Sequence, residues 1–136
     1  MKFPAFLLII IAFTLLTNCT SNQKRIEKLN ADGIEKIRNG DNKGAIEDFT
    51  SIISLQEDNY EAYYYRANAK FNLKQAKEAL LDYNKTIELK PDNADAFYNR
   101  AFCRQFLNDN DGACLDWIKA DSLGKPNVKD LLNVCQ

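Results

Sequence analysis

A period of 34 residues is the feature that most constrains how this chain folds. Residues of one kind recur at that spacing in six columns, three of which are Ala45, Ala79 and Ala113; Phe49, Tyr83 and Trp117; and Asp48, Asp82 and Asp116. So many coincidences at a single offset indicate three copies of one structural unit, spanning residues 26–59, 60–93 and 94–127. Each copy is expected to bury its apolar face against its neighbours.

Each copy has the pattern of two helices joined by a turn. In the second copy we expect helices at residues 60–73 and 76–89, because apolar residues recur there at steps of three and four. Pro91 ends the pair, since proline cannot continue a helix. The sequence therefore predicts an all-α chain, a right-handed superhelix of three helix pairs followed by a C-terminal capping helix.

The residues at corresponding positions of the copies carry a family resemblance. They are Tyr63, Ala67, Phe71, Ala79, Tyr83 and Pro91 in the second copy and Phe97, Ala101, Ala113 and Trp117 in the third. This pattern resembles the tetratricopeptide repeat (TPR) family over residues 26–127. The resemblance implies a TPR α-solenoid of three helix-turn-helix repeats, whose first helices line a concave groove for extended or helical peptides. It also implies a non-catalytic protein-binding module, serving as a scaffold or assembly factor.

The resemblance places an inward-facing stripe on the first helix of the second and third copies. From this stripe we predict that a protein or peptide ligand contacts Tyr64, Asn68, Phe71, Tyr98, Phe102 and Phe106. Aromatic rings bury large areas in such contacts, and amide side chains bind backbone groups. Packing within the repeats, or against the capping helix, is the alternative role for the rings.

Some TPR domains hold the acidic C-terminal tails of heat-shock chaperones with a clamp of Lys, Asn and Arg. The corresponding positions here are Asn30, Ile34, Tyr65, Asp95 and Asn99. Asp95 and Asn99 replace two cations of that clamp. The resemblance therefore disfavours an acidic tail as the ligand of this chain.

Residues 128–136 look like the first helix of an incomplete fourth copy. Leu131 lies in register with Tyr63 and Phe97, and it belongs to a short apolar stripe that begins at Val128. We expect these residues to cap the apolar end of the solenoid, with Asn127 as the N-cap of the capping helix.

The cysteines in the third copy and the cap favour one disulfide. Cys114 follows Ala113 on the side expected to face the capping helix, and Cys135 lies in the close-packed column of Ala101. We predict a Cys114–Cys135 disulfide and a free, buried Cys103. Three free thiols or a disulfide with Cys103 are the alternatives, whereas a zinc site lacks the CxxC spacing.

Composition excludes several classes of function. The chain has no His, which removes Ser-His-Asp and Cys-His catalysis. With 18 Lys and Arg against 19 Asp and Glu, it lacks the basic excess of a nucleic-acid binder. We expect no cofactor and no metal. An enzyme would have to use Asp48, Asp82 and Asp116, which we interpret as solvated or helix-capping, so that Asp82→Asn is expected to leave function intact.

Residues 1–18 have the pattern of a cleaved signal peptide. Lys2 precedes an apolar run from Phe3 to Leu16, which is short for a membrane-spanning helix. The segment Leu16-Thr17-Asn18-Cys19 resembles a bacterial lipobox, whose Cys is diacylated with fatty acids such as palmitate and becomes the new N-terminus.

We therefore predict a lipidated Cys19, a tether over residues 19–25, and a chain that resembles a small bacterial TPR lipoprotein. It would be anchored in the cell envelope on the extracytoplasmic side, with the outer membrane favoured. The alternatives are a purely structural envelope protein and a cytosol-facing TPR protein on an uncleaved signal anchor.

Overall fold

The computed structural model describes residues 5–135 and is helical throughout, with no strand in that part of the chain. The helices are α1 (Ala5–Arg38), α2 (Asn42–Leu55), α3 (Tyr60–Asn72), α4 (Ala76–Leu89), α5 (Ala94–Phe106), α6 (Asn110–Ser122) and α7 (Lys129–Leu132), followed by the 3₁₀ turn η1 (Asn133–Cys135). The predicted all-α solenoid is confirmed.

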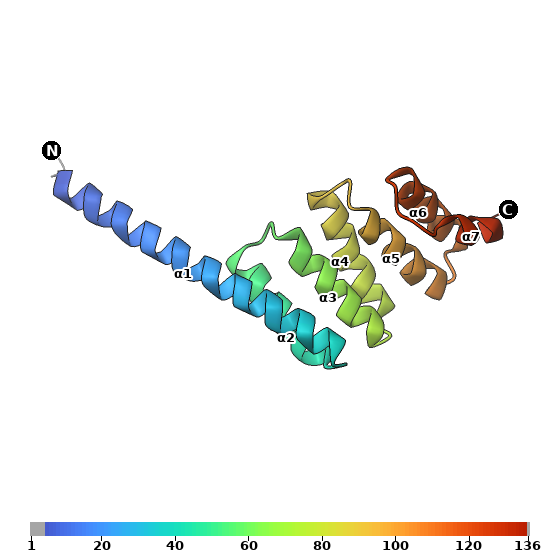
Figure 1. The fold of residues 1–136 in the computed structure, drawn as a ribbon, viewed down its shortest axis with the longest axis horizontal. Helices are drawn as coiled ribbons and strands as arrows, with labels where there is room; N and C mark the ends of the chain where they lie inside the picture. Colours follow the sequence, from blue (N-terminus) through green and yellow to red (C-terminus); the bar gives the residue numbers. More distant parts are fainter. Residues whose placement is uncertain (1–4, 136) are drawn as a thin grey trace.

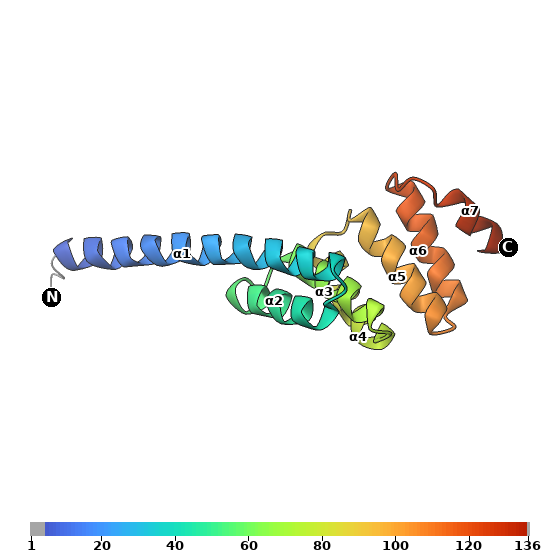
Figure 2. The same ribbon diagram turned by 60° about the horizontal axis from the view of Figure 1, so that its bottom comes forward.

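The helices pack as three successive pairs. The C-terminal part of α1 pairs with α2, α3 with α4, and α5 with α6, and each pair contacts the next (Figure 1, Figure 2). The first helices also contact one another, α1 with α3 and α3 with α5. They therefore line one common side of the solenoid.

The turns repeat with the same period as the core. Asn59 and Asn93 cap α3 and α5 by accepting hydrogen bonds from the backbone N–H groups of Ala62 and Ala96, each at 3.0 Å. The turn within each copy contains one residue with a left-handed backbone, at Gly40, Lys74 and Asn108, with φ of 83°, 64° and 64°. These three positions lie 34 residues apart, so one turn geometry is used three times.

A large ring packed on a small residue forms the core of each pair. Phe49, Tyr83 and Trp117 are at most 1% exposed. In the first copy the opposing residue is Gly33, where a Cβ atom would lie 2.8 Å from Cζ of Phe49. Small residues in this column therefore let the two helices of a pair approach closely.

The aspartate column is not solvated, which corrects our interpretation. Asp82 and Asp116 are 5% and 3% exposed. Asp82 accepts two hydrogen bonds from Arg66, each at 2.8 Å, and one from Lys70 at 2.6 Å. Buried carboxylates need such partners, and here the partners come from the first helix of the same pair.

The third copy repeats this arrangement. Arg100 donates to both oxygens of Asp116, at 2.8 and 2.6 Å, and Arg104 lies 3.1 Å away. In the first copy Lys36 forms the equivalent ion pair with Asp48 at 2.6 Å. These cations therefore join the two helices of each pair.

The N-terminal segment and the first helix of the first copy form one continuous helix, α1. Residues 1–4 of the predicted signal peptide lie outside the described residues. The rest of it, together with residues 19–25, forms the N-terminal part of α1, which extends away from the other helices (Figure 1). The predicted tether at 19–25 is thus part of a helix, and no Gly or Pro interrupts the sequence between Pro4 and Gly33. Within the residues whose side chains the structure describes, no helix combines the length and the hydropathy needed to cross a bilayer.

The predicted cap at 128–136 is present but short, and its last residue lies outside the described part. Val128 is fully buried against the third copy, and Leu131 packs beside it. Asn127 is not an N-cap: its φ is 61°, and α7 starts with Val128 at the N-cap position and no side-chain cap. Asn127 instead makes the left-handed turn that directs the chain into the cap.

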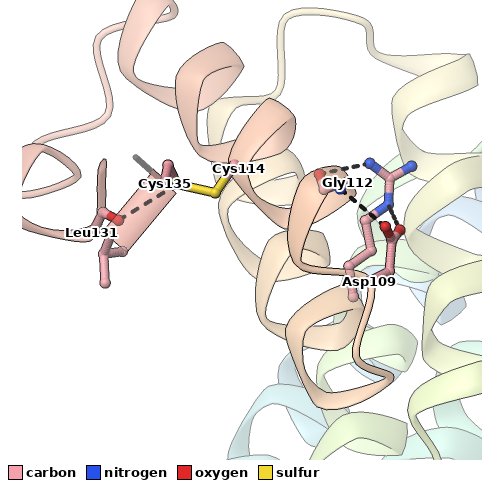
Figure 3. Close-up of a disulfide and its surroundings, with 6 residues drawn as sticks. Asp109, Gly112, Cys114, Leu131 and Cys135 are labelled. Atoms are coloured by element: carbon pink, nitrogen blue, oxygen red, sulfur yellow. Dashed lines mark hydrogen bonds and ion pairs between the residues drawn. A yellow bond between two sulfur atoms is a disulfide. The ribbon is translucent and has the colours of Figure 1, made fainter. Parts of the chain in front are cut away.

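A disulfide fixes the cap to the third copy. Sγ of Cys114 on α6 and Sγ of Cys135 in η1 are 2.08 Å apart (Figure 3). The structure thus pairs the two cysteines named from the sequence. Cys103 is free and buried, as expected.

Candidate functional site

A pocket of about 200 Å³ lies on the inner side of the second and third copies. Its lining residues come from α3, α4 and α5, and they are Asn68, Phe71, Asn72, Tyr83, Asn99 and Phe102. None of these side chains is charged. We call this the central pocket.

Hydrogen bonds fix the amide groups of the central pocket. The hydroxyl of Tyr83 donates to Oδ1 of Asn68 at 2.6 Å. Nδ2 of Asn99 donates to the same oxygen and to the hydroxyl of Tyr64, both at 3.0 Å. The amide of Asn68 also forms a hydrogen bond with the Tyr64 hydroxyl, whereas within the described residues none engages Oδ1 of Asn99. Because an amide nitrogen carries two N–H groups, the network leaves one N–H of Asn68 and Oδ1 of Asn99 free.

Burial keeps the two tyrosine hydroxyls neutral. It raises the pKa of Tyr83 well above the ordinary value of 10.0, and it also raises the pKa of Tyr64. Both groups stay protonated at physiological pH. The network is therefore held by neutral hydrogen bonds.

Aromatic rings border the pocket on both sides. Phe71 contacts Phe106 edge to face, with ring centroids 6.1 Å apart, and Phe106 is 53% exposed. Phe102 packs between Tyr98 and Trp117, with centroid distances of 5.0 and 5.4 Å. An apolar side chain of a ligand would thus meet the exposed ring of Phe106 and the packed rings of Phe71 and Phe102.

Two charged groups beside Tyr64 and Tyr98, Lys125 and Asp95, pair with each other. Nζ of Lys125 donates to Oδ1 of Asp95 at 2.5 Å and lies 5.2 Å from the centroid of the Tyr98 ring. The hydrogen bond to Asp95 raises the pKa of Lys125. The cation is therefore paired within the chain, and none lines the central pocket.

Three of the six residues predicted to contact a ligand line the central pocket, and three do not. Asn68, Phe71 and Phe102 line the central pocket. Tyr64 lies behind it as a hydrogen-bond acceptor, while Tyr98 packs beside Phe102. Phe106 adds an exposed ring next to Phe71.

Three lining residues were not among the predicted contacts: Asn72, Tyr83 and Asn99. Tyr83 belongs to the column of large rings that is buried in every copy. Asn99 had been considered only as a clamp position. Asn99 lies three residues before Phe102, and this helical spacing predicts that both lie on one face of the helix.

In the part of the chain that the structure describes, no group of three His, Cys, Asp or Glu side chains could hold a metal ion. The chemistry of the site consists of neutral donors, neutral acceptors and rings.

Comparison with known proteins fits this geometry. Residues 68–104, from the middle of α3 to the last turn of α5, match the TPR repeat family. This stretch of the chain is therefore similar to tetratricopeptide (TPR) repeats. No protein of curated function matches the chain in sequence.

Several solved TPR domains share the fold. The Arabidopsis OM64 TPR domain is 24% identical, with a TM-score of 0.79 over 82% of this chain and 94% of that one. The first TPR of Spaghetti (RPAP3), bound to the HSP90 peptide SRMEEVD, is 23% identical, with a TM-score of 0.77 over 81% and 89%. PcrH, in complex with the chaperone binding region of PopD, is 18% identical, with a TM-score of 0.79 over 82% and 91%. At these identities the likeness shows the fold alone.

Proposed function

We propose that this chain is a non-catalytic module that binds a segment of another protein through the central pocket. The observation that carries the proposal is the free donor and acceptor pair, Nδ2 of Asn68 and Oδ1 of Asn99. A peptide unit offers one carbonyl oxygen and one N–H group, which matches this pair. The bordering rings supply apolar contact area for a neighbouring side chain.

Similar domains support this proposal. The TPR domains of Spaghetti and of human RPAP3 are described in complex with HSP90 and HSP70 peptides. A shared fold does not transfer a ligand. The peptide SRMEEVD carries several carboxylates, whereas the central pocket holds no cation, so we propose an uncharged segment as the ligand of this chain.

The proposal is tested by capture of partners on two matched variants. Phe106→Ala removes the exposed ring beside Phe71, and Leu81→Ala removes an exposed apolar side chain from α4, outside the pocket. The purified wild type and both variants are immobilised and incubated with cell-envelope extract, and captured proteins are quantified by mass spectrometry. Loss of a ring contact at an interface centre costs about 2 kcal/mol, or roughly thirtyfold in affinity.

We expect one or more proteins to be captured by the wild type and Leu81→Ala and to be depleted with Phe106→Ala. An identical set of proteins on all three would contradict the proposed site.

We further propose that the module is a membrane-tethered scaffold or assembly factor of the cell envelope, held by acyl chains on Cys19. The sequence supports this proposal through Lys2, the apolar run after it and the lipobox-like segment that ends at Cys19. Intact mass of the protein purified from membranes tests it. Loss of residues 1–18 with added acyl mass is expected, together with loss of that mass in Cys19→Ala. A full-length, unmodified chain would contradict it.

A further inference from the structure

Three cations lie close together on α1, shortly after Cys19. They are Lys24, Arg25 and Lys28, and all three are exposed. They are separated by steps of one, three and four residues, so they share one side of the helix. We call this side, defined by these three residues, the basic face.

The basic face points away from the core of the solenoid. Ile26, Leu29 and Ile34 pack into the core of the first copy. A helix turns by about 100° per residue, which puts the centre of the basic face opposite these three apolar side chains. The part of α1 that precedes the basic face projects beyond the other helices (Figure 1, Figure 2). The basic face is therefore open to an external partner.

The cations of the basic face are not neutralised within the chain. Among the described residues, no ion pair involves any of the three. Glu27, the carboxylate nearest to them in sequence, accepts a hydrogen bond from Gln23 at 3.2 Å instead. Asp32 and Glu35 follow one and two turns later on the same side of α1, where the charge becomes acidic.

The net charge changes sign along the chain. Residues 20–28 carry three cations and one acid, which is a net charge of +2. Residues 29–136 carry 14 Lys and Arg against 18 Asp and Glu, which is a net charge of −4. A negatively charged surface would therefore attract the segment next to Cys19 and repel the rest of the solenoid.

The basic face lies within reach of the surface of a membrane that holds Cys19. A helix rises about 1.5 Å per residue, so Lys24 and Lys28 lie about 8 and 14 Å beyond Cys19 along α1. The headgroup layer on each side of a bilayer is about 5–8 Å thick. Charges act over about 8 Å beyond it at physiological ionic strength. All three cations fall within this range when α1 stands upright, and a tilt toward the basic face brings them closer.

We propose that the basic face binds the anionic headgroups of phospholipids in the membrane that holds Cys19. This contact rests on the proposed membrane tether and is independent of the proposed peptide binding. The guanidinium of Arg25 can bind two phosphate oxygens in parallel, and the two lysines act as point charges. The contact ends at Asp32, because the same headgroups repel its carboxylate.

Partition between two kinds of vesicle tests this contact. Protein purified from membranes is characterised by intact mass and then mixed with vesicles of phosphatidylcholine and denser vesicles that also contain phosphatidylglycerol. The detergent concentration leaves the vesicles intact and allows the protein to exchange, and flotation separates the two populations.

Two triple variants with the same net charge are compared with the wild type. Lys24→Gln/Arg25→Gln/Lys28→Gln removes the basic face. The control removes three exposed cations from the second helices of the repeats, which form no ion pair among the described residues: Lys43→Gln/Lys77→Gln/Lys119→Gln.

Each unit of positive charge near an anionic surface contributes about fivefold in affinity, so the net charge of +2 predicts about a 25-fold preference of the wild type for phosphatidylglycerol vesicles. We expect the control variant to keep this preference and the variant without the basic face to lose it. The preference of the wild type is also expected to fall as the salt concentration is raised.

An acylated wild type without a preference for phosphatidylglycerol would overturn this contact and leave the tether in place. Equal preferences of the two triple variants would also overturn it, since the effect would then not belong to the basic face. A full-length, unmodified chain would contradict the acyl tether alone, and the partition of that chain would still decide whether the basic face binds anionic headgroups.

Discussion

Asp82 and Arg66 lie on the two helices of one repeat and are joined by two parallel hydrogen bonds of 2.8 Å, with Asp82 only 5% exposed. Arg66 also donates to Thr50 of the preceding copy at 3.1 Å. The same arrangement recurs one repeat later, where Arg100 donates to Asp116 and to Asn84. Each arginine therefore ties its own repeat together and connects it to the one before.

We predict that Asp82→Asn destabilises the fold by about 3 kcal/mol, because it leaves two partly buried cations without their carboxylate. Urea unfolding followed by Trp117 fluorescence measures the free energy of unfolding. Asp92→Asn is the matched control, since Asp92 is 65% exposed and pairs only with Lys90. A change of about 0.5 kcal/mol or less is expected for the control. Equal stability of Asp82→Asn and wild type would restore the interpretation of this column as solvated.

The disulfide provides a second prediction, at the C-terminal end. Closing a segment of 21 residues is expected to contribute about 3 kcal/mol. Reduction should therefore lower the melting temperature of the wild type and leave Cys114→Ser/Cys135→Ser unaffected, as measured by circular dichroism with and without dithiothreitol. A wild-type melting temperature that ignores the reductant would show that the bond does not support the cap.

The thiol of Cys103 should be unreactive toward alkylating reagents in the folded protein. Burial raises the pKa of its thiol to about 12, so the thiolate is scarce near neutral pH, and the side chain is inaccessible. Iodoacetamide at about pH 8 is expected to leave Cys103 unmodified until urea unfolds the chain, and peptide mass spectrometry identifies the modified position. Rapid alkylation of Cys103 without denaturant would be incompatible with its place between the second and third copies.

The hydroxyl of Tyr83 predicts a dependence of stability on pH. Its pKa is raised in the folded state above 10.0, the value expected when unfolded, so stability from the protonated hydroxyl is fully present below about pH 10 and is lost as the pH rises further. Tyr83→Phe removes the hydrogen bond to Asn68 and is expected to cost about 1 kcal/mol at neutral pH. It should also lose less stability than the wild type between about pH 9 and pH 11. Parallel losses in both proteins over that range would assign the effect to other groups.

Local sequence patterns predicted most of the fold. The helices of the second repeat were expected at 60–73 and 76–89 and are found at Tyr60–Asn72 and Ala76–Leu89. They were predictable because helix caps, proline and apolar spacing are local signals. Asn127 was misjudged for the same reason: asparagine suits an N-cap and also a left-handed turn, and only the packing of Val128 decides between them.

The site was predicted only in part, because its determining contacts join different helices. An aspartate on an amphipathic helix has the sequence signature of a solvated residue, and its burial depends on an arginine 16 positions earlier on the paired helix. The free amide atoms of Asn68 and Asn99 are visible only once the hydrogen bonds of the central pocket are known. The 34-residue period gave one further signal. Arg66 and Arg100 recur at the same spacing as Asp82 and Asp116, the aspartates to which they donate hydrogen bonds.

The most direct test of the central claim is site-specific photo-crosslinking in cells. p-Benzoylphenylalanine is placed at position 106, beside the central pocket, and in a second strain at position 81, an exposed apolar position on α4 outside the pocket. Binding through the groove predicts a crosslinked protein adduct from position 106 and none from position 81. No adduct from position 106, or the same adduct from both positions, would contradict a binding site in this groove.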